Sequence, residues 1–165
     1  MGKKAWQYSK LDVSVTKRFK KIGNLGEYLA GILLLENGFK NIRNLNKEYS
    51  SNTADFDFTA ERNGVNYAIS VKARNKYETR NKYENSTAGQ KLNSRYKLTD
   101  DPIKFSEEAK LRYRGVAAWV AISLEIDKGV FSAYFGKLSD LSGNQKGINM
   151  SENAKRNYEQ LAFSK

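Results

Sequence analysis

The chain has 165 residues, enough for one well-buried core and too few for two ordinary domains, so a single domain spanning residues 1–165 is expected. It contains no cysteine and no histidine, which excludes disulfides, thiolate catalysis, zinc-finger sites and any mechanism with an imidazole base. Its 29 Lys and Arg residues against 18 Asp and Glu residues give a formal net charge of +11, which favours a polyanionic partner, above all nucleic acid.

An anionic membrane surface is the alternative partner for such a charge. The sequence has no apolar run long enough to span a bilayer, since the stretch from Ile32 to Leu35 covers only one helical turn. The first ten residues also lack the apolar core of a signal peptide. We therefore expect a cytoplasmic protein that does not act at a membrane.

The first third of the chain predicts a basic arm followed by a helix. Residues 1–21 are rich in lysine with scattered aromatic side chains, and they are expected to form the N-terminal arm. From Asn24 to Asn37 the apolar residues recur at helical spacing, with Asn24 placed to cap the start and Gly38 to close the end. Residues 39–45 are then expected to form a short strand or a connection.

Two strands joined by a tight turn are predicted next. Residues 54–61 alternate between apolar and polar side chains, Asn63-Gly64 is a strong hairpin signal, and residues 65–73 provide the partner strand. The polar, basic and tyrosine-containing segment 75–101 is expected to be a loop or a loosely helical insertion.

Period-two geometry gives these strands a defined set of faces. It places Asp55 and Asp57 on one face of the first strand. It likewise places Ser70 and Lys72 on one face of the second strand. The sequence leaves open whether those two faces adjoin.

The second half of the chain predicts an alternation of helices and strands. A helix is expected over 102–113, a strand buried on both faces over 116–124, its hairpin partner over 130–135, and a terminal helix over 151–162. Four aromatic residues of the two strands are expected in the core: Trp119, Phe131, Tyr134 and Phe135. The order of elements predicts an α/β domain on a mixed central sheet.

An acidic residue on one strand, a tight turn and a lysine on the next strand match the needs of metal-assisted phosphodiester hydrolysis. Carboxylates hold a hard divalent cation such as magnesium. The lysine orients or helps deprotonate the attacking water and offsets the charge that develops on the phosphate. Here the two segments are residues 54–58 and 68–74.

Residues 23–74 resemble the PD-(D/E)xK nuclease superfamily, and most of all the archaeal Holliday junction resolvases and related small restriction-type nucleases. The resemblance is carried by Gly26-Glu27 in the helix, Gly38-Phe39 at its end and Ser70-Val71-Lys72 on the last strand. The separation between Asp57 and Ser70 is usual for the aspartate and the second acid of that family.

The resemblance implies a restriction-endonuclease-like α/β core and a Mg²⁺- or Mn²⁺-dependent endonuclease acting on DNA, branched or structured DNA included. Asp57 aligns with the metal-binding aspartate, Lys72 with the catalytic lysine and Glu27 with the helix carboxylate. The candidate catalytic residues are Lys72, Asp57, Glu27, Ser70 and Gln90, and the candidate metal ligands are Asp57, Asp55, Glu27 and Val71.

Two positions depart from the family pattern. Ser70 occupies the place of the second acid and is a poor magnesium ligand, and Phe56 occupies the place of the proline before the aspartate. Asp55 is expected to restore the missing charge from the strand face that it shares with Asp57. The alternative is a catalytically silent nucleic-acid-binding module on a nuclease scaffold.

The basic, aromatic segment after Lys72 is expected to contact the substrate, with a solvated charged loop as the alternative. Its candidate residues are Arg74, Lys76, Tyr77, Arg80, Lys82, Tyr83, Lys91, Arg95 and Lys97. DNA is the expected partner and RNA the alternative, because recognition of the 2′-hydroxyl leaves no short motif. The resemblance is also compatible with a homodimer, for which the sequence indicates no interface.

Overall fold

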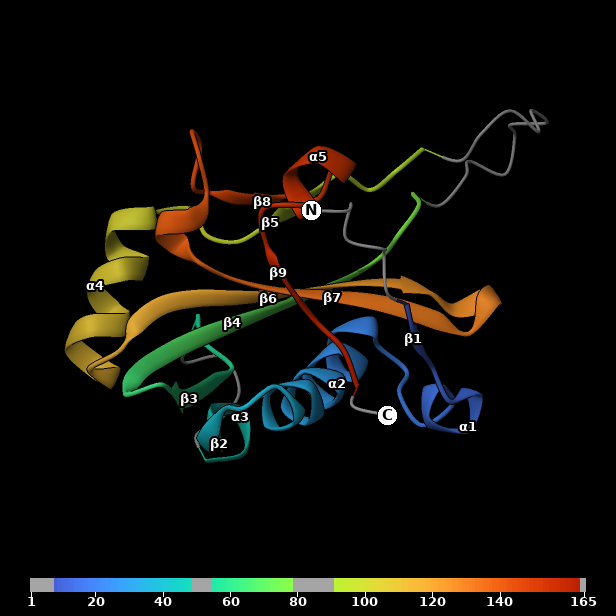
Figure 1. Cartoon of the computed structure of the whole chain (residues 1–165), viewed down its shortest axis with the longest axis horizontal. Coiled ribbons are helices and arrows are strands. Elements are labelled where there is room, and N and C mark those ends of the chain that lie inside the picture. The colour runs from blue at the N-terminus through green and yellow to red at the C-terminus, as the bar shows by residue number, and fades with distance from the viewer. Residues whose placement is uncertain (1–7, 49–54, 79–90, 164–165) are drawn as a thin grey trace.

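The computed structural model describes residues 8–48, 55–78 and 91–163, and within them a mixed sheet has helices on both faces (Figure 1). The strand order is β1–β7–β6–β4–β3–β2, and β9 also pairs with β7. The strands of this sheet are β1 (Ser9–Lys10), β2 (Lys40–Asn44), β3 (Phe58–Arg62), β4 (Val65–Asn75), β6 (Val116–Glu125), β7 (Val130–Lys137) and β9 (Glu159–Leu161).

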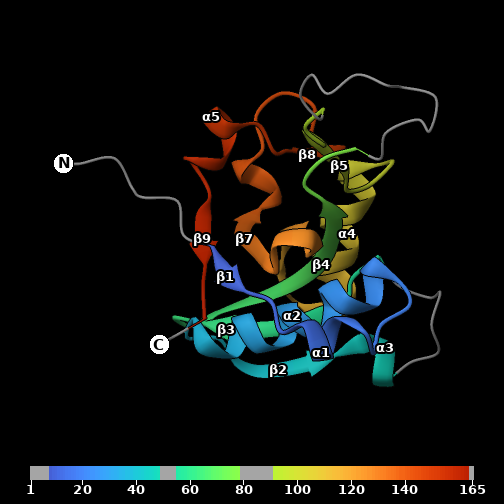
Figure 2. The same cartoon turned by 90° about the vertical axis from the view of Figure 1, so that its right-hand side faces the viewer.

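Two long helices cover opposite faces of the sheet, α2 (Ile22–Glu36) and α4 (Pro102–Tyr113). A second, two-stranded sheet of β5 (Arg95–Lys97) and β8 (Gly147–Asn149) lies on the α4 face, as Figures 1 and 2 show. The short helical segments are α1 (Val13–Thr16), α3 (Leu45–Glu48), η1 (Ile126–Lys128), η2 (Leu138–Asp140) and α5 (Glu152–Lys155). Of the helices described, none is both long and apolar enough to cross a membrane.

The centre of the sheet is the parallel pair β4 and β6. Their register runs from Tyr67 opposite Val116 to Asn75 opposite Leu124. Every residue of β6 from Ala117 to Leu124 is buried, because side chains on alternate positions pack against α2 on one face and α4 on the other. The four aromatic residues predicted for the core are buried as well. These findings confirm the expected mixed α/β architecture.

The hairpin and the α4 helix follow the prediction closely. Asn63 and Gly64 both have positive φ (53° and 77°), as a two-residue hairpin turn requires. Asp101 caps α4, since its carboxylate oxygen accepts hydrogen bonds from the amides of Ile103 and Lys104 at 3.1 Å. The left-handed residue after that helix is Arg114, with φ 52°.

The start of α2 differs from the prediction. The helix begins at Ile22 with Lys21 as its N-cap, and no side chain caps its first turn. Asn24 therefore lies inside the helix and does not cap it. Gly38 follows the helix end with φ +88°, which confirms its predicted place after the last turn.

The C-terminal segment is a short helix followed by a strand. Ser151 caps α5 through a hydrogen bond from the Ala154 amide (3.3 Å), but the helix ends at Lys155. The prediction of a helix to residue 162 is wrong because β9 pairs with the open edge of β7. Tyr158 reaches the core, where its ring lies 4.7 Å from that of Trp119. Strand pairing with a distant segment overrides the local helical pattern.

Two segments expected to be irregular contribute to the sheets. Within 1–21, β1 pairs with β7 and the Leu11 side chain is buried, so residues 8–21 are not only a basic arm. Within 75–101, β5 places Tyr96 in the core, next to the buried Leu98. Residues 1–7 and 79–90 lie outside the described part of the chain.

Gly26 lets α2 lie directly against β4. A Cβ atom at this position would lie 2.4 Å from the Cβ of Ala73, closer than two carbon atoms can approach. It would also lie 3.8 Å from a methyl group of Val71. The absent side chain thus sets how near the helix, and the neighbouring Glu27, comes to the middle of β4.

The substitution Gly26→Ala is therefore expected to lower the free energy of unfolding by about 1–3 kcal/mol through overpacking. Gly23→Ala in the same helix is the matched control, because nothing lies within 4 Å of its added Cβ. That control should raise stability by roughly 0.5–1 kcal/mol through helix propensity. Urea unfolding of both variants measures the difference, and equal stabilisation by the two would contradict the close contact.

Candidate functional site

The candidate site lies where β3 ends and β4 continues. The pairing of β3 with β4 stops at Phe58 opposite Ile69, whereas β4 runs on to Asn75 beside β6. The Val71 amide therefore has no strand partner on the β3 side. It donates instead to the Oδ2 atom of Asp57 (2.7 Å), so a side-chain carboxylate continues the ladder beyond the last residue of the strand.

The Asp57 carboxylate is held on both oxygens. Its Oδ1 atom accepts a hydrogen bond from the Asn46 amide nitrogen at 2.9 Å, while its backbone amide donates to the Ile69 carbonyl at 2.8 Å. Burial raises the pKa of Asp57, and the hydrogen bonds from Val71 and Asn46 act against that rise. The result is a half-buried carboxylate that two hydrogen bonds hold in place beside β4.

Lys72 lies on the opposite side of β4 from Val71, on the same face as Ser70. This confirms the predicted shared face of Ser70 and Lys72, since both belong to one regular strand. Burial lowers the pKa of Lys72, and the negative charges of Asp57 and Asp55 act in the other direction. Lys72 is thus within electrostatic reach of the Asp57 carboxylate.

Glu27 reaches the same region from α2. Its Oε1 atom accepts a hydrogen bond from the Asn44 side-chain amide at 2.7 Å. Burial is the largest cause of the raised pKa of Asp57, and the negative charge of Glu27 raises it further. The structure therefore brings together Glu27 of α2, Asp57 of the segment before β3 and Lys72 of β4.

Ser70 and Asp55 do not complete the acid set as expected. Ser70 is fully buried (0% exposed), and its hydroxyl oxygen has no hydrogen-bond partner among the described residues. Because β3 begins only at Phe58, Asp55 and Asp57 do not lie on one strand face, and Asp55 is exposed whereas Asp57 is half-buried. The described residues contain no group of three acidic side chains arranged to hold a metal ion.

The donors that remain fit a magnesium ion bound largely by water and substrate. The Ile69 carbonyl accepts from the Asp57 amide and so faces the β3 side of β4. Residues two apart in a strand direct their backbone groups to the same edge, so the carbonyl of Val71 faces that side as well, where β3 no longer pairs with β4. That carbonyl and the Asp57 carboxylate are hard oxygen donors. Mg²⁺ commonly takes one or two carboxylates and completes its octahedron with water and substrate phosphates.

The candidate nucleic-acid residues fall into three groups. Arg74, Lys91, Arg95 and Lys97 are exposed. Tyr77 is half-buried and forms an isolated bridge with Leu92. Arg80, Lys82 and Tyr83 lie outside the described residues, as does the candidate catalytic residue Gln90.

Lys76, expected to contact phosphate, differs from the exposed basic residues because its ammonium group is bound within the protein. Its side chain is 14% exposed, and its Nζ atom lies 3.2 Å from a Glu125 carboxylate oxygen and 3.3 Å from the Tyr8 hydroxyl. The ammonium group already has partners inside the protein, so it is not free to bind phosphate as an exposed lysine would be.

Sequence reasoning missed Asn44 and Asn46, the two residues whose amides hold the acids. They lie at the corner between β2 and α3, in a segment predicted only as a strand or connection. An Asn-Leu-Asn tripeptide has no chemical signature of its own. The contacts arise from tertiary placement alone.

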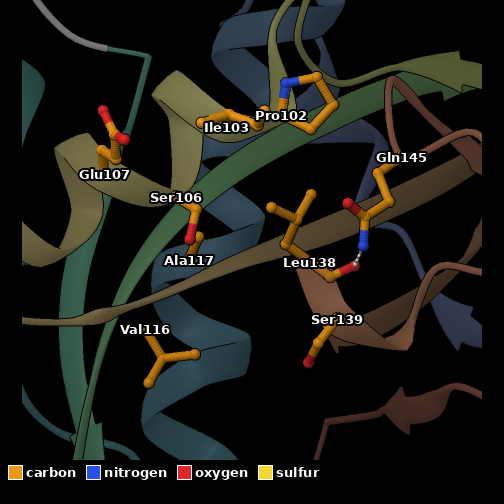
Figure 3. A pocket seen from close by; sticks show the side chains of 9 residues that line it. All are labelled: Pro102, Ile103, Ser106, Glu107, Val116, Ala117, Leu138, Ser139 and Gln145. Atoms are coloured by element: carbon orange, nitrogen blue, oxygen red, sulfur yellow. Dashed lines mark hydrogen bonds between the residues drawn. The ribbon is translucent and has the colours of Figure 1, made fainter.

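A surface pocket of about 370 Å³ lies elsewhere, between α4, the start of β6 and η2 (Figure 3). Its apolar lining comes from Ile103, Val116 and Leu138, and the Gln145 amide nitrogen donates to the Leu138 carbonyl at 3.2 Å. None of the candidate catalytic residues lines this pocket. We therefore place the chemistry at the open edge of β4 and not in the pocket.

The raised pKa of Asp57 predicts a specific pH dependence of stability. Between the ordinary value of 3.8 and the raised folded value, the unfolded chain releases a proton that the folded chain keeps, so stability falls as pH rises. Below that window both states are protonated, and above it the loss is constant. Asp57→Asn should remove this loss, because an amide carries no buried charge.

Urea unfolding at a series of pH values measures the wild-type stability against that of Asp57→Asn. Between pH 3.8 and the raised pKa of folded Asp57, the free energy of unfolding of the wild type should fall relative to that of Asp57→Asn. At higher pH the difference between the two proteins should stay constant. Asn66→Ala, at an exposed position of β4 that carries no titratable group, should keep the wild-type pH trend. The opposite slope, with the wild type gaining stability over Asp57→Asn, would show that the carboxylate is stabilised when charged.

Comparisons with known proteins support the fold. No family model matches the chain, and no curated protein does so. Among solved structures, the chain is similar to Hjc, a Holliday junction resolvase from the archaeal hyperthermophile Archaeoglobus fulgidus, with a TM-score of 0.54 and 16% sequence identity. The match covers 84% of this chain and 95% of that protein. The chain thus has the restriction-endonuclease-like α/β fold, which it shares with a nuclease.

Proposed function

We propose that the chain is a metal-dependent endonuclease that cleaves DNA. The observation that carries the proposal is the half-buried Asp57 carboxylate, which accepts a hydrogen bond from the Val71 amide at the open edge of β4, with Lys72 in electrostatic reach. Titratable groups with displaced pKa values that gather at one place are typical of catalytic sites. The shared fold with a resolvase supports the same reading.

The metal ion would be held by the Asp57 carboxylate and the Val71 carbonyl, and Glu27 would add negative charge from α2. When bound, Mg²⁺ or Mn²⁺ supplies charge to stabilise the phosphate and lowers the pKa of coordinated water. The backbone amide of Val71 and the Asn46 side chain keep Asp57 oriented for this task. The role of Asp55 would be at most electrostatic, since its side chain is exposed and outside the strand.

Lys72 would act on the water and the phosphate. Because burial lowers its pKa, less free energy is needed for Lys72 to exchange a proton near neutral pH than for an exposed lysine. In its charged form it would offset the negative charge that builds on the phosphate during attack. Both tasks require a lysine that is close to the acid and screened from water.

DNA is the proposed substrate because exposed cations lie next to the site. Arg74 is two residues from Lys72 on the same strand. Burial is the main cause of the lowered pKa of Lys72, and the positive charge of Lys97 lowers it further, so Lys97 also lies near the site. Together with the net charge of +11, these residues provide phosphate contacts. We extend the proposal to branched DNA, the substrate class named for the structural neighbour.

A silent nucleic-acid-binding module is the second candidate function. The observation that favours it is Ser70, a buried side chain without charge where the resemblance implies an acid. Loss of a charged ligand weakens the binding of hard cations. This candidate predicts salt-sensitive DNA binding without metal-dependent cleavage.

The experiment that separates the two candidates is a cleavage assay on supercoiled, linear, single-stranded and four-way-junction DNA, with magnesium or manganese against chelator. We expect metal-dependent cutting by the wild type. Asp57→Asn and Lys72→Ala should reduce it by about 10³-fold or more, as for other essential catalytic groups. DNA binding should persist in both variants, because exposed cations elsewhere support it.

The control for that assay is Asp127→Asn, which removes an exposed carboxylate far along the chain in η1 and should leave cutting unchanged. Absence of cutting by the wild type with every metal and substrate, while binding is retained, would establish the silent module instead. Cutting that survives in Asp57→Asn would place the active site elsewhere.

DNA affinity should depend on the exposed cation Arg74 and not on the half-buried Lys76. Arg74→Ala should weaken binding and reduce the slope of log K against log salt by about 1, with the unfolding temperature unchanged. Lys76→Ala should lower the unfolding temperature, because the contacts of Lys76 with Glu125 and Tyr8 are lost, and should leave the salt slope unchanged. Fluorescence anisotropy at several salt concentrations measures the slopes, and a reversed pattern would contradict the assignment.

A further inference from the structure

We propose that Asn44 and Asn46 are positioning residues that hold the two acids of the site, Glu27 and Asp57. This inference rests on the proposed nuclease function and deepens it. It concerns residues for which neither the sequence pattern nor the fold comparison gives a role. Each asparagine donates one side-chain hydrogen bond to one carboxylate, at 2.7 Å for Asn44 and 2.9 Å for Asn46.

Asn44 is oriented by the backbone of the corner. Its Oδ1 atom accepts hydrogen bonds from the amides of Asn46 (3.0 Å) and Lys47 (3.2 Å), the pattern of a residue that caps a helical turn. With the oxygen engaged there, the amide nitrogen must face Glu27. The side chain therefore links the start of α3 to a carboxylate on α2.

Asn46 is oriented by its acceptor and by the residue between the two asparagines. A carboxylate only accepts hydrogen bonds, so the amide nitrogen of Asn46 must face Asp57. Leu45 is buried in the core on the α4 side, and its own amide donates to the Asp57 carbonyl at 2.9 Å. Asn44, Leu45 and Asn46 thus connect α2 and the segment before β3 to the corner between β2 and α3.

The corner has a chemical advantage for this site. An amide donates a hydrogen bond without adding charge, whereas an aspartate at either position would repel the acid that it faces. With Ser70 in place of a second acid, the half-buried Asp57 is the carboxylate that binds the open edge through the Val71 amide. Its orientation, and that of Glu27, then determines how well a cation is held.

The first test measures the contacts in the metal-free protein. Carbon-13 NMR of the side-chain carboxyl groups should show the Asp57 signal moving in Asn46→Ala and the Glu27 signal moving in Asn44→Ser. Serine keeps the oxygen that caps the corner and removes the amide donor. Asn66→Ala, at an exposed position near the start of β4, is the matched control and should move neither signal.

The second test measures the magnesium dependence of cleavage. Each corner variant should need about 10–100-fold more magnesium for half-maximal cutting, as is typical when partners of metal ligands are removed. The rate at saturating magnesium and the KM for DNA should change less. Asn46→Gln, which keeps an amide donor, should recover part of the magnesium affinity, and Asn66→Ala should match the wild type.

The outcomes separate this inference from the proposed function. Unmoved carboxyl signals, or moved signals with unchanged magnesium dependence in a cutting enzyme, would overturn the positioning role and leave the nuclease intact. A wild type that does not cut at all would overturn the proposed function, and the carboxyl signals would then still establish or refute the hold of the two asparagines on the acids.

Discussion

The length difference between β3 and β4 is the constraint on which the site depends. A backbone amide buried in a sheet must find an acceptor, and β3 ends before it can supply one to Val71. The Asp57 carboxylate takes that place. A side chain that completes the sheet is thereby fixed at an edge where the Val71 carbonyl also faces outward. The atoms that stabilise the sheet are therefore also the candidate metal ligands.

The close contact between α2 and β4 extends this arrangement to a second acid. Because Gly26 has no side chain, the helix lies against Ala73, and Glu27 follows directly in the sequence. The corner formed by Asn44 and Asn46 then joins the two carboxylates through neutral donors. The electrostatic balance is completed by Lys72, whose pKa is lowered by burial and raised by Asp57. The site therefore combines three carboxylate or ammonium groups at limited solvent exposure.

The sequence predicted those parts that follow from local periodicity and turn chemistry. The Asn63-Gly64 hairpin, the buried β6 strand and the common face of Ser70 and Lys72 were all accessible, because each depends on residues close in sequence. Asp57 and Lys72 could be singled out for the same reason.

The remaining features depend on contacts between distant segments. Asp55 was expected beside Asp57, but the strand begins three residues later and leaves it in solvent. In the sequence, Lys76 cannot be distinguished from the other basic residues of its segment, and only the fold reveals its ion pair with Glu125. The asparagine corner likewise depends on how β2 meets α2.

The most direct test of the central claim is a crystal of the protein soaked in manganese and measured at a wavelength where manganese scatters anomalously. We expect an anomalous peak between the Asp57 carboxylate and the Val71 carbonyl, and we expect that peak to be lost in Asp57→Asn. A well-ordered open edge of β4 without any peak, or a manganese site formed by other residues, would contradict the assignment of the metal-binding site.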